Sequence, residues 1–223
     1  MKSLTMPVVL DHRLSFPDPQ TANSEGLVAI GGDFSPARLR LAYRAGIFPW
    51  TANAITWWSP DPRGIFELNK FHVPHSLAKF MRKQPFKITR DCAFRRVMEG
   101  CAATTSNRGR SWVTPEFIKA YTRLHELGNA HSVECWRGDE LVGGIYGVSF
   151  GGFFAGESMF HRAPNASKVA LHHLVEHLRS RGFVLFDIQM ITPATKQFGA
   201  VEIPREEYLK RLKSAVEMDY SFD

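Results

Sequence analysis

The spacing of hydrophobic residues changes along the chain, and each change marks a different kind of element. In the first half, apolar side chains recur every three or four positions, which is the period of an amphipathic helix. Four such helices are expected, beginning at Ser35-Pro36, Pro74, Asp91 and Thr114-Pro115. Each should place its apolar face on a core and its charged face in water.

The second half begins with apolar runs that are broken by glycine-containing turns. Residues 131–160 predict antiparallel strands. Residues 165–182 return to the helical period and lead directly into an apolar strand, FVLFDIQ, at residues 183–189. A last helix is expected from Pro204 to about Val216. Helices, a strand meander, a long helix and a returning strand together predict an α+β fold.

A proline-rich turn, SPDPRG at residues 59–64, separates this region from the start of the chain. Its two prolines make a stiff connection, so we expect a domain boundary there. Residues 1–62 should form a small N-terminal α/β domain and residues 63–223 a larger domain. The order of meander, helix and strand in the larger part resembles the core of GNAT acyltransferases, a likeness of fold that does not fix the function.

The composition is that of a packed globular protein. The chain has 223 residues, of which 44% are hydrophobic and 22% are charged. No apolar stretch approaches the roughly 20 residues that span a bilayer, and the apolar run near the N-terminus is too short for a secretory signal. A soluble cytoplasmic protein without a membrane partner is therefore expected.

Cysteine and histidine spacing gives no indication of a disulfide framework or a metal site. The three cysteines are an odd number and lack a CxxC pair. His173 and His177 are one helical turn apart, but they lie opposite the leucine stripe and outside any HExxH motif. A solvated helix face is the favoured interpretation, and no metal is expected.

Positive charge is concentrated in one part of the chain. Residues 79–110 contain nine basic residues against two acidic ones, whereas the whole chain has a net charge of +6. The basic residues are Lys79, Arg82, Lys83, Lys87, Arg90, Arg95, Arg96, Arg108 and Arg110. Such a block predicts a docking face for a polyanion such as nucleic acid, and the alternative is a solvated helical surface.

The strand at residues 183–189 ends in two polar side chains that its apolar start does not explain. Because side chains alternate along a strand, Asp187 and Gln189 are expected on one face, with Phe186 and Ile188 on the other. A buried carboxylate is costly unless it is paired, so the two side chains either have partners or line a pocket. The alternative is a strand end that emerges into water.

Glu157 and two tryptophans are further candidates for a site. Glu157 follows Gly156 near the end of a strand and could attract a positively charged amine, unless it is a surface acid at the end of a hairpin. Trp112 follows the basic block, and the stacking of an aromatic ring on an unpaired base contributes about 1–3 kcal/mol. Trp50 is a candidate of the same kind.

Several of these stretches occur together, and in this order, in one known family. The segments GLVAIGGDFSPARLRLAYRAGIFPW, WWSPDPRG, SVECW, ELVGGIYG, FAGESMF and NASK, with EIP before the last helix, resemble leucyl/phenylalanyl-tRNA–protein transferases over nearly the whole chain. The resemblance implies a GNAT-like larger domain. It also implies an enzyme that moves Leu, Phe or Met from aminoacyl-tRNA to the N-terminal Arg or Lys of a protein, which marks that protein for N-end-rule degradation.

The resemblance gives roles to the polar and aromatic candidates. Asp187 and Gln189 correspond to the catalytic pair of the family, and Glu157 corresponds to an acid in its pocket. Trp50 and Trp112 correspond to positions that contact the 3′-terminal adenosine of the tRNA.

The remaining correspondences concern the transferred side chain and the tRNA. Tyr121 matches a position close to the reacting centre. The apolar pocket corresponds to Ile145, Phe154, Met159, Leu174 and Phe186. The surface for the tRNA acceptor stem corresponds to Lys79, Arg82, Lys83, Arg95 and Arg96.

The chemistry of the donor sets further expectations. An aminoacyl ester is already activated, so neither a cofactor nor a metal is expected. A monomer is expected. The chain departs from the family pattern at His161 and in residues 190–199, and these positions should influence which amino acid is transferred.

Two other functions are compatible with parts of the sequence. A CoA-dependent N-acetyltransferase of the GNAT type would need a glycine-containing pyrophosphate loop where residues 161–167 read HRAPNAS. A non-catalytic RNA-binding module would explain the basic block but not the three polar side chains at the strand ends. Transfer or hydrolysis of a labelled amino acid from tRNA distinguishes an enzyme from such a module.

Overall fold

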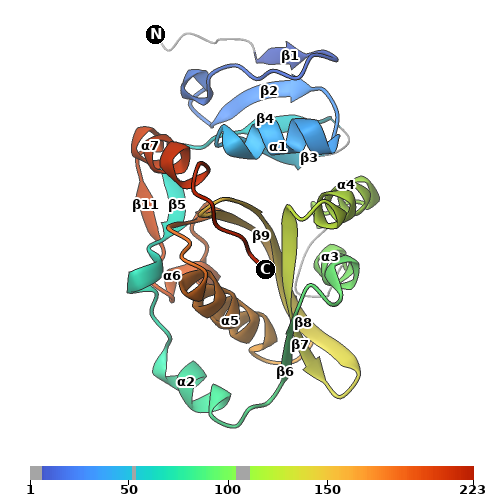
Figure 1. The fold of residues 1–223 in the computed structure, drawn as a ribbon, viewed down its shortest axis with the longest axis vertical. Coiled ribbons are helices and arrows are strands. Elements are labelled where there is room, and N and C mark those ends of the chain that lie inside the picture. The colour runs from blue at the N-terminus through green and yellow to red at the C-terminus, as the bar shows by residue number, and fades with distance from the viewer. Residues whose placement is uncertain (1–6, 52–53, 104–110) are drawn as a thin grey trace.

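The computed structural model describes residues 7–51, 54–103 and 111–223, so Arg108 and Arg110 of the basic block lie outside the described residues. Two β-sheets with surrounding helices make up the structure (Figure 1). The α-helices are α1 Pro36–Arg44, α2 His75–Met81, α3 Phe94–Ala102, α4 Pro115–Glu126, α5 Ala166–Ser180, α6 Pro193–Lys196 and α7 Arg205–Ala215. Two short 3-10 helices, η1 Pro19–Thr21 and η2 Leu68–Lys70, lie in connections.

The smaller sheet comes from the start of the chain. Its four strands, β1 Val8–Leu10, β2 Leu27–Gly31, β3 Phe48–Thr51 and β4 Thr56–Trp58, follow the order β1-β2-β4-β3. Helix α1 begins as predicted, because the Ser35 side chain accepts a hydrogen bond from the amide of Arg38 and Pro36 occupies the first turn. Gly46 follows the helix in the left-handed conformation, with φ of 76°.

The larger sheet holds the meander that the sequence predicted. Its strands are β5 Arg63–Phe66, β6 Lys87–Arg90, β7 Ala130–Arg137, β8 Glu140–Phe150, β9 Phe153–His161, β10 Leu185–Gln189 and β11 Val201–Ile203. Their order is β11-β5-β10-β9-β8-β7-β6. The meander β7–β8–β9 is antiparallel, α5 then crosses over, and β10 returns parallel to β9. The α+β fold class is therefore confirmed.

Some expectations about individual elements were wrong. The short strands β1, β2, β5, β6 and β11 were not predicted, because they have three to five residues each, and all of them except β6 contain or adjoin glycine or proline. Asp91 does not cap α3, whose N-cap is Ala93. Instead Asp91 has a left-handed φ of 54°, and its carboxylate accepts hydrogen bonds from the Ser132 amide and from His131 Nδ1, each at 2.7 Å.

The two sheets share one hydrophobic core. Trp57 and Tyr43 of the smaller sheet region pack in the same cluster as Phe117 of α4 and Phe150 of β8. A second cluster lies between the larger sheet and α5 (Figure 1). The division into domains at residue 63 stays a prediction.

The helices of the structure can be compared with the expectation that no segment spans a membrane. Among the described residues, no helix combines the length and the apolar character needed to cross a bilayer.

Candidate active site

A cavity of about 960 Å³ opens where the edge of the smaller sheet meets strands β9 and β10. Strand β3, the end of α3, the N-terminal part of α5 and the segment after β10 complete its wall. Seven of the predicted site residues line it: Trp50, Trp112, Ile145, Glu157, Met159, Phe186 and Gln189. Residues that are far apart in the sequence therefore meet in one site.

The cavity begins where two parallel strands separate. β9 and β10 are paired as far as Ala155 and Asp187, and no pairing between them follows. In the pairing of β9 with β8, Glu157 is an extra residue, since Gly156 pairs with Gly147 and Ser158 with Tyr146. In the pairing of β10 with β5, Ile188 is extra in the same way. Such β-bulges redirect side chains, and here they deliver Glu157 and Gln189 to the same opening.

Asp187 does not line the cavity, and the prediction that it shares a face with Gln189 was wrong. The bulge at Ile188 interrupts the alternation, so Phe186, Ile188 and Gln189 all line the cavity while Asp187 is fully buried behind it. Its carboxylate accepts hydrogen bonds from Arg63 Nε at 2.9 Å and Arg63 Nη2 at 2.6 Å. The charge of Asp187 is therefore paired, as the cost of burial requires.

Arg63 was missed by the sequence analysis, which assigned it to a turn. Its guanidinium also donates to the backbone oxygen of Gly46 at 3.1 Å, and it lies over the rings of Phe48 and Tyr208. Burial acts to lower the pKa of Arg63, but the Asp187 carboxylate outweighs it and raises that pKa. The Tyr208 hydroxyl completes the network by donating to Asp187 at 2.9 Å.

Gln189 connects this buried network to the cavity. Its backbone amide donates to Asp187 Oδ1 at 2.9 Å, and its φ of 57° is in the left-handed region. That conformation is uncommon for a residue other than glycine, asparagine or aspartate, and the fixed carboxylate of Asp187 holds it. The Gln189 side chain then reaches Glu157, and its Nε2 donates to Glu157 Oε1 at 3.3 Å.

Glu157 is a half-buried acid in the cavity wall. Burial, opposed by a hydrogen bond from Tyr43 and reinforced by the charge of Asp187, raises the pKa of Glu157 to about 8. Tyr43 is in turn hydrogen-bonded to the Tyr121 hydroxyl. Tyr121 is fully buried, so it reaches the site only through Tyr43.

The apolar part of the cavity contains some of the predicted residues but not all. Ile145, Met159 and Phe186 line it, whereas Phe154 and Leu174 are buried behind the wall. Leu171, which lies one helical turn before Leu174 on α5, lines the cavity in its place. Spacing alone could not decide which of two leucines on the same helix face reaches the cavity.

Gly156 has a packing role beside this apolar wall. A Cβ atom at Gly156 would lie 3.0 Å from Cε2 of Phe186. The glycine therefore leaves room for the Phe186 ring in the wall of the cavity.

The predicted tRNA-binding residues do not lie together. Lys79, Arg82 and Lys83 are on or just after α2, while Arg95 and Arg96 are exposed on α3, and Figure 1 shows the two helices well apart. As far as the structure describes the cavity wall, it contains none of these five side chains.

Other basic side chains line the cavity instead. They are His161, Arg162 and Lys168, from the end of β9 and the start of α5. Of these, the sequence analysis noticed only His161, as a departure from the family pattern. Arg162 and Lys168 were not recognised from the sequence, because they lie outside the basic block at residues 79–110.

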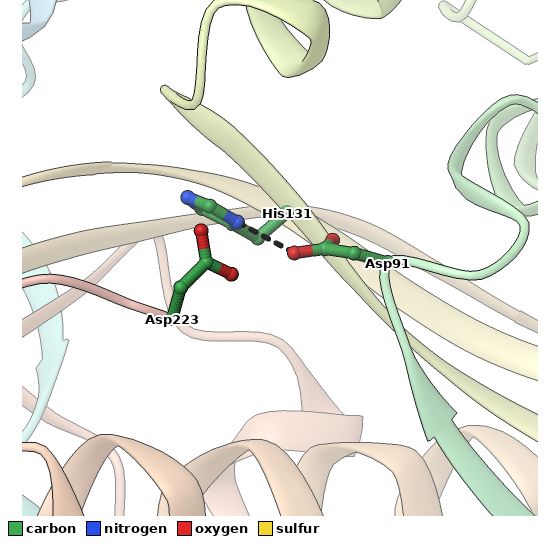
Figure 2. A group of neighbouring side chains, drawn as sticks. All are labelled: Asp91, His131 and Asp223. Atoms are coloured by element: carbon green, nitrogen blue, oxygen red, sulfur yellow. Dashed lines mark hydrogen bonds and ion pairs between the residues drawn. The ribbon is translucent and has the colours of Figure 1, made fainter.

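One group of side chains among the described residues is close enough together to hold a metal ion: Asp91, His131 and Asp223 (Figure 2). Arg90 and Arg181 line the adjacent hollow, where their positive charges oppose a bound cation. Asp91 already accepts hydrogen bonds from His131 and from a backbone amide. We assign no metal to this group.

A family profile described as leucyl/phenylalanyl-tRNA protein transferase matches residues 65–213, and the profile of that family's N-terminal domain matches residues 32–61. The chain belongs to this family. Leucyl/phenylalanyl-tRNA–protein transferases of Magnetococcus marinus and of an Enterobacter species are 51% and 50% identical to it over 209 and 205 residues. These alignments cover 91% and 90% of this chain and 88% and 87% of the relatives.

Membership in the leucyl/phenylalanyl-tRNA–protein transferase family makes the chain an aminoacyltransferase enzyme that acts with aminoacyl-tRNA and protein. Among solved structures, a GCN5-related N-acetyltransferase from Kribbella flavida is similar with a TM-score of 0.41 and 9% sequence identity. That likeness covers 73% of this chain and 59% of the other.

Proposed function

We propose that this transferase moves Leu, Phe or Met from aminoacyl-tRNA to the N-terminal Arg or Lys of acceptor proteins, and so marks them for N-end-rule degradation. It acts in the cytoplasm as a monomer. The observation that carries the proposal is the contact between Gln189 and Glu157 at one end of a largely apolar cavity, with Trp50 and Trp112 in the same wall.

The donor fits the aromatic and apolar parts of the cavity. Trp50 and Trp112 offer ring faces to the terminal adenosine, and each stacked base contributes about 1–3 kcal/mol. Ile145, Met159 and Phe186 surround the transferred side chain. An apolar pocket separates side chains that differ by one methylene by only about 1–3 kcal/mol, which agrees with a preference shared among Leu, Phe and Met.

The acceptor is recognised by charge. An N-terminal Arg or Lys brings two positive groups, the α-ammonium and its side chain, and Glu157 offers a carboxylate in the cavity wall. A positive group beside Glu157 favours the ionised form of this half-buried acid. Hydrogen bonds between charged groups are about twice as strong as neutral ones, so Glu157 selects such an end over an apolar one.

Positioning accounts for much of the rate. The Gln189 side-chain oxygen accepts a hydrogen bond from the attacking amine, and Asp187 holds Gln189 in place through its backbone amide. Because Asp187 is paired with Arg63, its contribution is orientation more than charge. Holding both reactants in a reactive geometry can lower the barrier by about 7–11 kcal/mol in favourable cases.

The tRNA acceptor stem contacts the basic residues of α2 and α3. Such contacts are largely independent of sequence and weaken as salt is added. If the affinity for aminoacyl-tRNA did not fall with added salt, these two helices would not be the docking surface.

A transfer assay tests the proposal. The protein is incubated with leucyl-, phenylalanyl- or methionyl-tRNA and with peptides that begin with Arg, Lys, Asp or Ala. Transfer to the Arg and Lys peptides, without ATP or CoA, is expected. Binding of tRNA with no transfer to any peptide would contradict the proposal and favour a non-catalytic RNA-binding protein. Acetyl transfer from acetyl-CoA would favour an N-acetyltransferase.

A further inference from the structure

The proposed reaction requires the acceptor ammonium to lose a proton, and Gln189 cannot remove it. An N-terminal amine has a pKa of about 7.7–8.0, so near neutral pH most of the acceptor arrives as an ammonium without a free electron pair. The amine must lose a proton before or during its attack on the ester. A carboxamide is too weakly basic to take that proton, and Gln189 can only orient the nucleophile.

Four titratable side chains line the cavity among the described residues: Glu157, His161, Arg162 and Lys168. Arg162 and Lys168 offer hydrogen-bond donors and no acceptor, so neither side chain suits the removal of a proton. His161 lies four residues beyond Glu157 on β9, which corresponds to roughly 13 Å along a strand. Glu157 is the one that contacts Gln189.

We infer that the Glu157 carboxylate is the general base that removes protons from the attacking α-ammonium nitrogen and passes one of them to the leaving group. The inference rests on the proposed transfer reaction. It assigns the proton to Glu157 and leaves the orientation of the amine to Gln189.

The geometry places the acid where the amine has to be. The hydrogen bond from Gln189 Nε2 to Glu157 Oε1 leaves the Gln189 oxygen and the second Glu157 oxygen for other partners. An amine that donates to the Gln189 oxygen therefore lies beside the Glu157 carboxylate. The bulge at Glu157 supports this position, since a regular β9 would carry the side chain elsewhere.

The surroundings of Glu157 suit the exchange of a proton. Tyr43 of α1 donates a hydrogen bond to it, and Tyr121 of α4 stands behind Tyr43. The charges of Asp187 and Arg63, from β10 and β5, face it with opposite signs and are paired with each other. With its pKa raised to about 8, Glu157 binds a proton about as strongly as the α-amine does, so the transfer between them costs little.

The step balances without any reactant other than water. The ammonium nitrogen loses two protons in all. The first passes to Glu157 and from there to water, and the freed nitrogen pair forms a bond to the ester carbonyl carbon. The second passes from the nitrogen of the tetrahedral intermediate to the Glu157 carboxylate. When the intermediate collapses, the carbon–oxygen bond to the tRNA ribose breaks, the ribose oxygen takes this second proton from Glu157, and a neutral peptide bond and the carboxylate remain.

Single-turnover transfer from leucyl-tRNA to a peptide with N-terminal Arg tests the inference. The wild type is compared with Glu157→Gln, whose amide oxygen can still accept the hydrogen bond from Gln189 Nε2 but cannot take a proton. At about pH 7 the variant should be slower by about 100-fold. At about pH 9.5 the acceptor amine is already neutral, so the deficit should shrink by about tenfold.

Two further variants control for a structural role. Gln189→Ala should show a deficit that does not change with pH, because Gln189 acts by orientation. Glu157→Asp retains a carboxylate but withdraws it from the acceptor amine by one methylene. Its transfer should be slower than that of the wild type but should depend on pH in the same way. Thermal unfolding of each variant verifies that it is folded.

A Glu157→Gln deficit of equal size at both pH values would overturn the inference, because Glu157 would then only hold Gln189. That result would leave the proposed function intact. A wild-type protein without transfer activity is a different result, and it would overturn the proposed function and this inference with it.

Discussion

Arg63 and Asp187 form an ion pair that is removed from water, with side chains 1% and 0% exposed. Two hydrogen bonds join them in a bidentate arrangement, and Tyr208 and the Gln189 amide use the remaining capacity of the carboxylate. A buried pair of this kind gains little net stability over apolar residues of similar volume. The pair is better explained by what it holds, which is the backbone of Gln189.

This explanation predicts that stability and activity will separate. Arg63→Met and Asp187→Leu should each lower the free energy of unfolding by about 3–5 kcal/mol, because each leaves a buried charge without its partner. The double variant should cost much less than the sum, since no unpaired charge remains. Its transfer rate should nevertheless stay low, because Gln189 has lost the acceptor for its amide. Urea unfolding and single-turnover transfer measure the two quantities.

The exposed pair Arg95–Glu99 on α3 is the matched control. Its side chains are 69% and 49% exposed, so a double-mutant cycle there should give less than about 1 kcal/mol. If the Arg63→Met, Asp187→Leu double variant transferred at the wild-type rate, Asp187 would have no positioning role.

At the level of elements, the sequence predicted whether a segment is a helix or a strand better than it predicted the detailed geometry of that segment. The helix over residues 165–182 and the strand that follows it were predicted because their periodicity is strong, and α5 and β10 confirm them. The faces of β10 were not predicted. Alternation assumes a regular strand, and nothing in the residue types at 187–189 indicates a bulge or a left-handed glutamine.

The partners of the predicted site residues were also beyond the sequence. Arg63 and Tyr208 are separated from Asp187 by 124 and 21 positions, and only the folded chain brings them together. Glu157, Trp50 and Trp112 were found because their chemistry is unusual for their positions. Which side chains become partners depends on the topology of the folded chain, and the chemistry of the individual residues does not determine that topology.

The separation of α2 from α3 leads to a prediction about tRNA binding. One variant changes Lys79, Arg82 and Lys83 to Ala, and another changes Arg95 and Arg96 to Ala. Each should lose contacts to a different set of tRNA phosphates. The two decreases in binding free energy should then add. The slope of log affinity against log salt should fall by about 1 for each phosphate that is no longer neutralised. Filter binding of aminoacyl-tRNA over a salt series measures both quantities.

Helix α7 offers a control, because it also carries exposed lysine side chains. Lys210 and Lys213 are exposed there, and Figure 1 shows α7 far from α2 and α3. Changing both to Ala should leave affinity and salt slope unaltered. An equal decrease in this control would mean that binding follows total charge and not these two helices.

The molecule as a whole is held together across the position where the sequence suggested a boundary. Phe34 and Phe117 pack with ring centroids 4.8 Å apart, the Tyr43 and Tyr121 hydroxyls are hydrogen-bonded, and Arg63 donates to the Gly46 carbonyl. One of the two hydrophobic clusters is built from residues on both sides of residue 63.

Unfolding should therefore be a single cooperative transition, although the chain is longer than most two-state proteins. Tryptophan fluorescence follows mainly the smaller sheet, which carries Trp50, Trp57 and Trp58, whereas far-UV circular dichroism follows all the helices and strands. The two signals should have the same urea midpoint. Two separate midpoints would mean that residues 1–62 and 63–223 are independently stable domains, as the sequence suggested.

The paired bulges in β9 and β10 have a consequence for how this site tolerates change. Glu157 and Gln189 reach the cavity because each strand has one residue more than its neighbour. Deleting one residue between Phe153 and His161, or between Leu185 and Met190, would restore regular strands and turn these side chains away. Relatives that keep the reaction should therefore vary in residue type in these two segments but not in length, so that insertions and deletions are tolerated less than most substitutions.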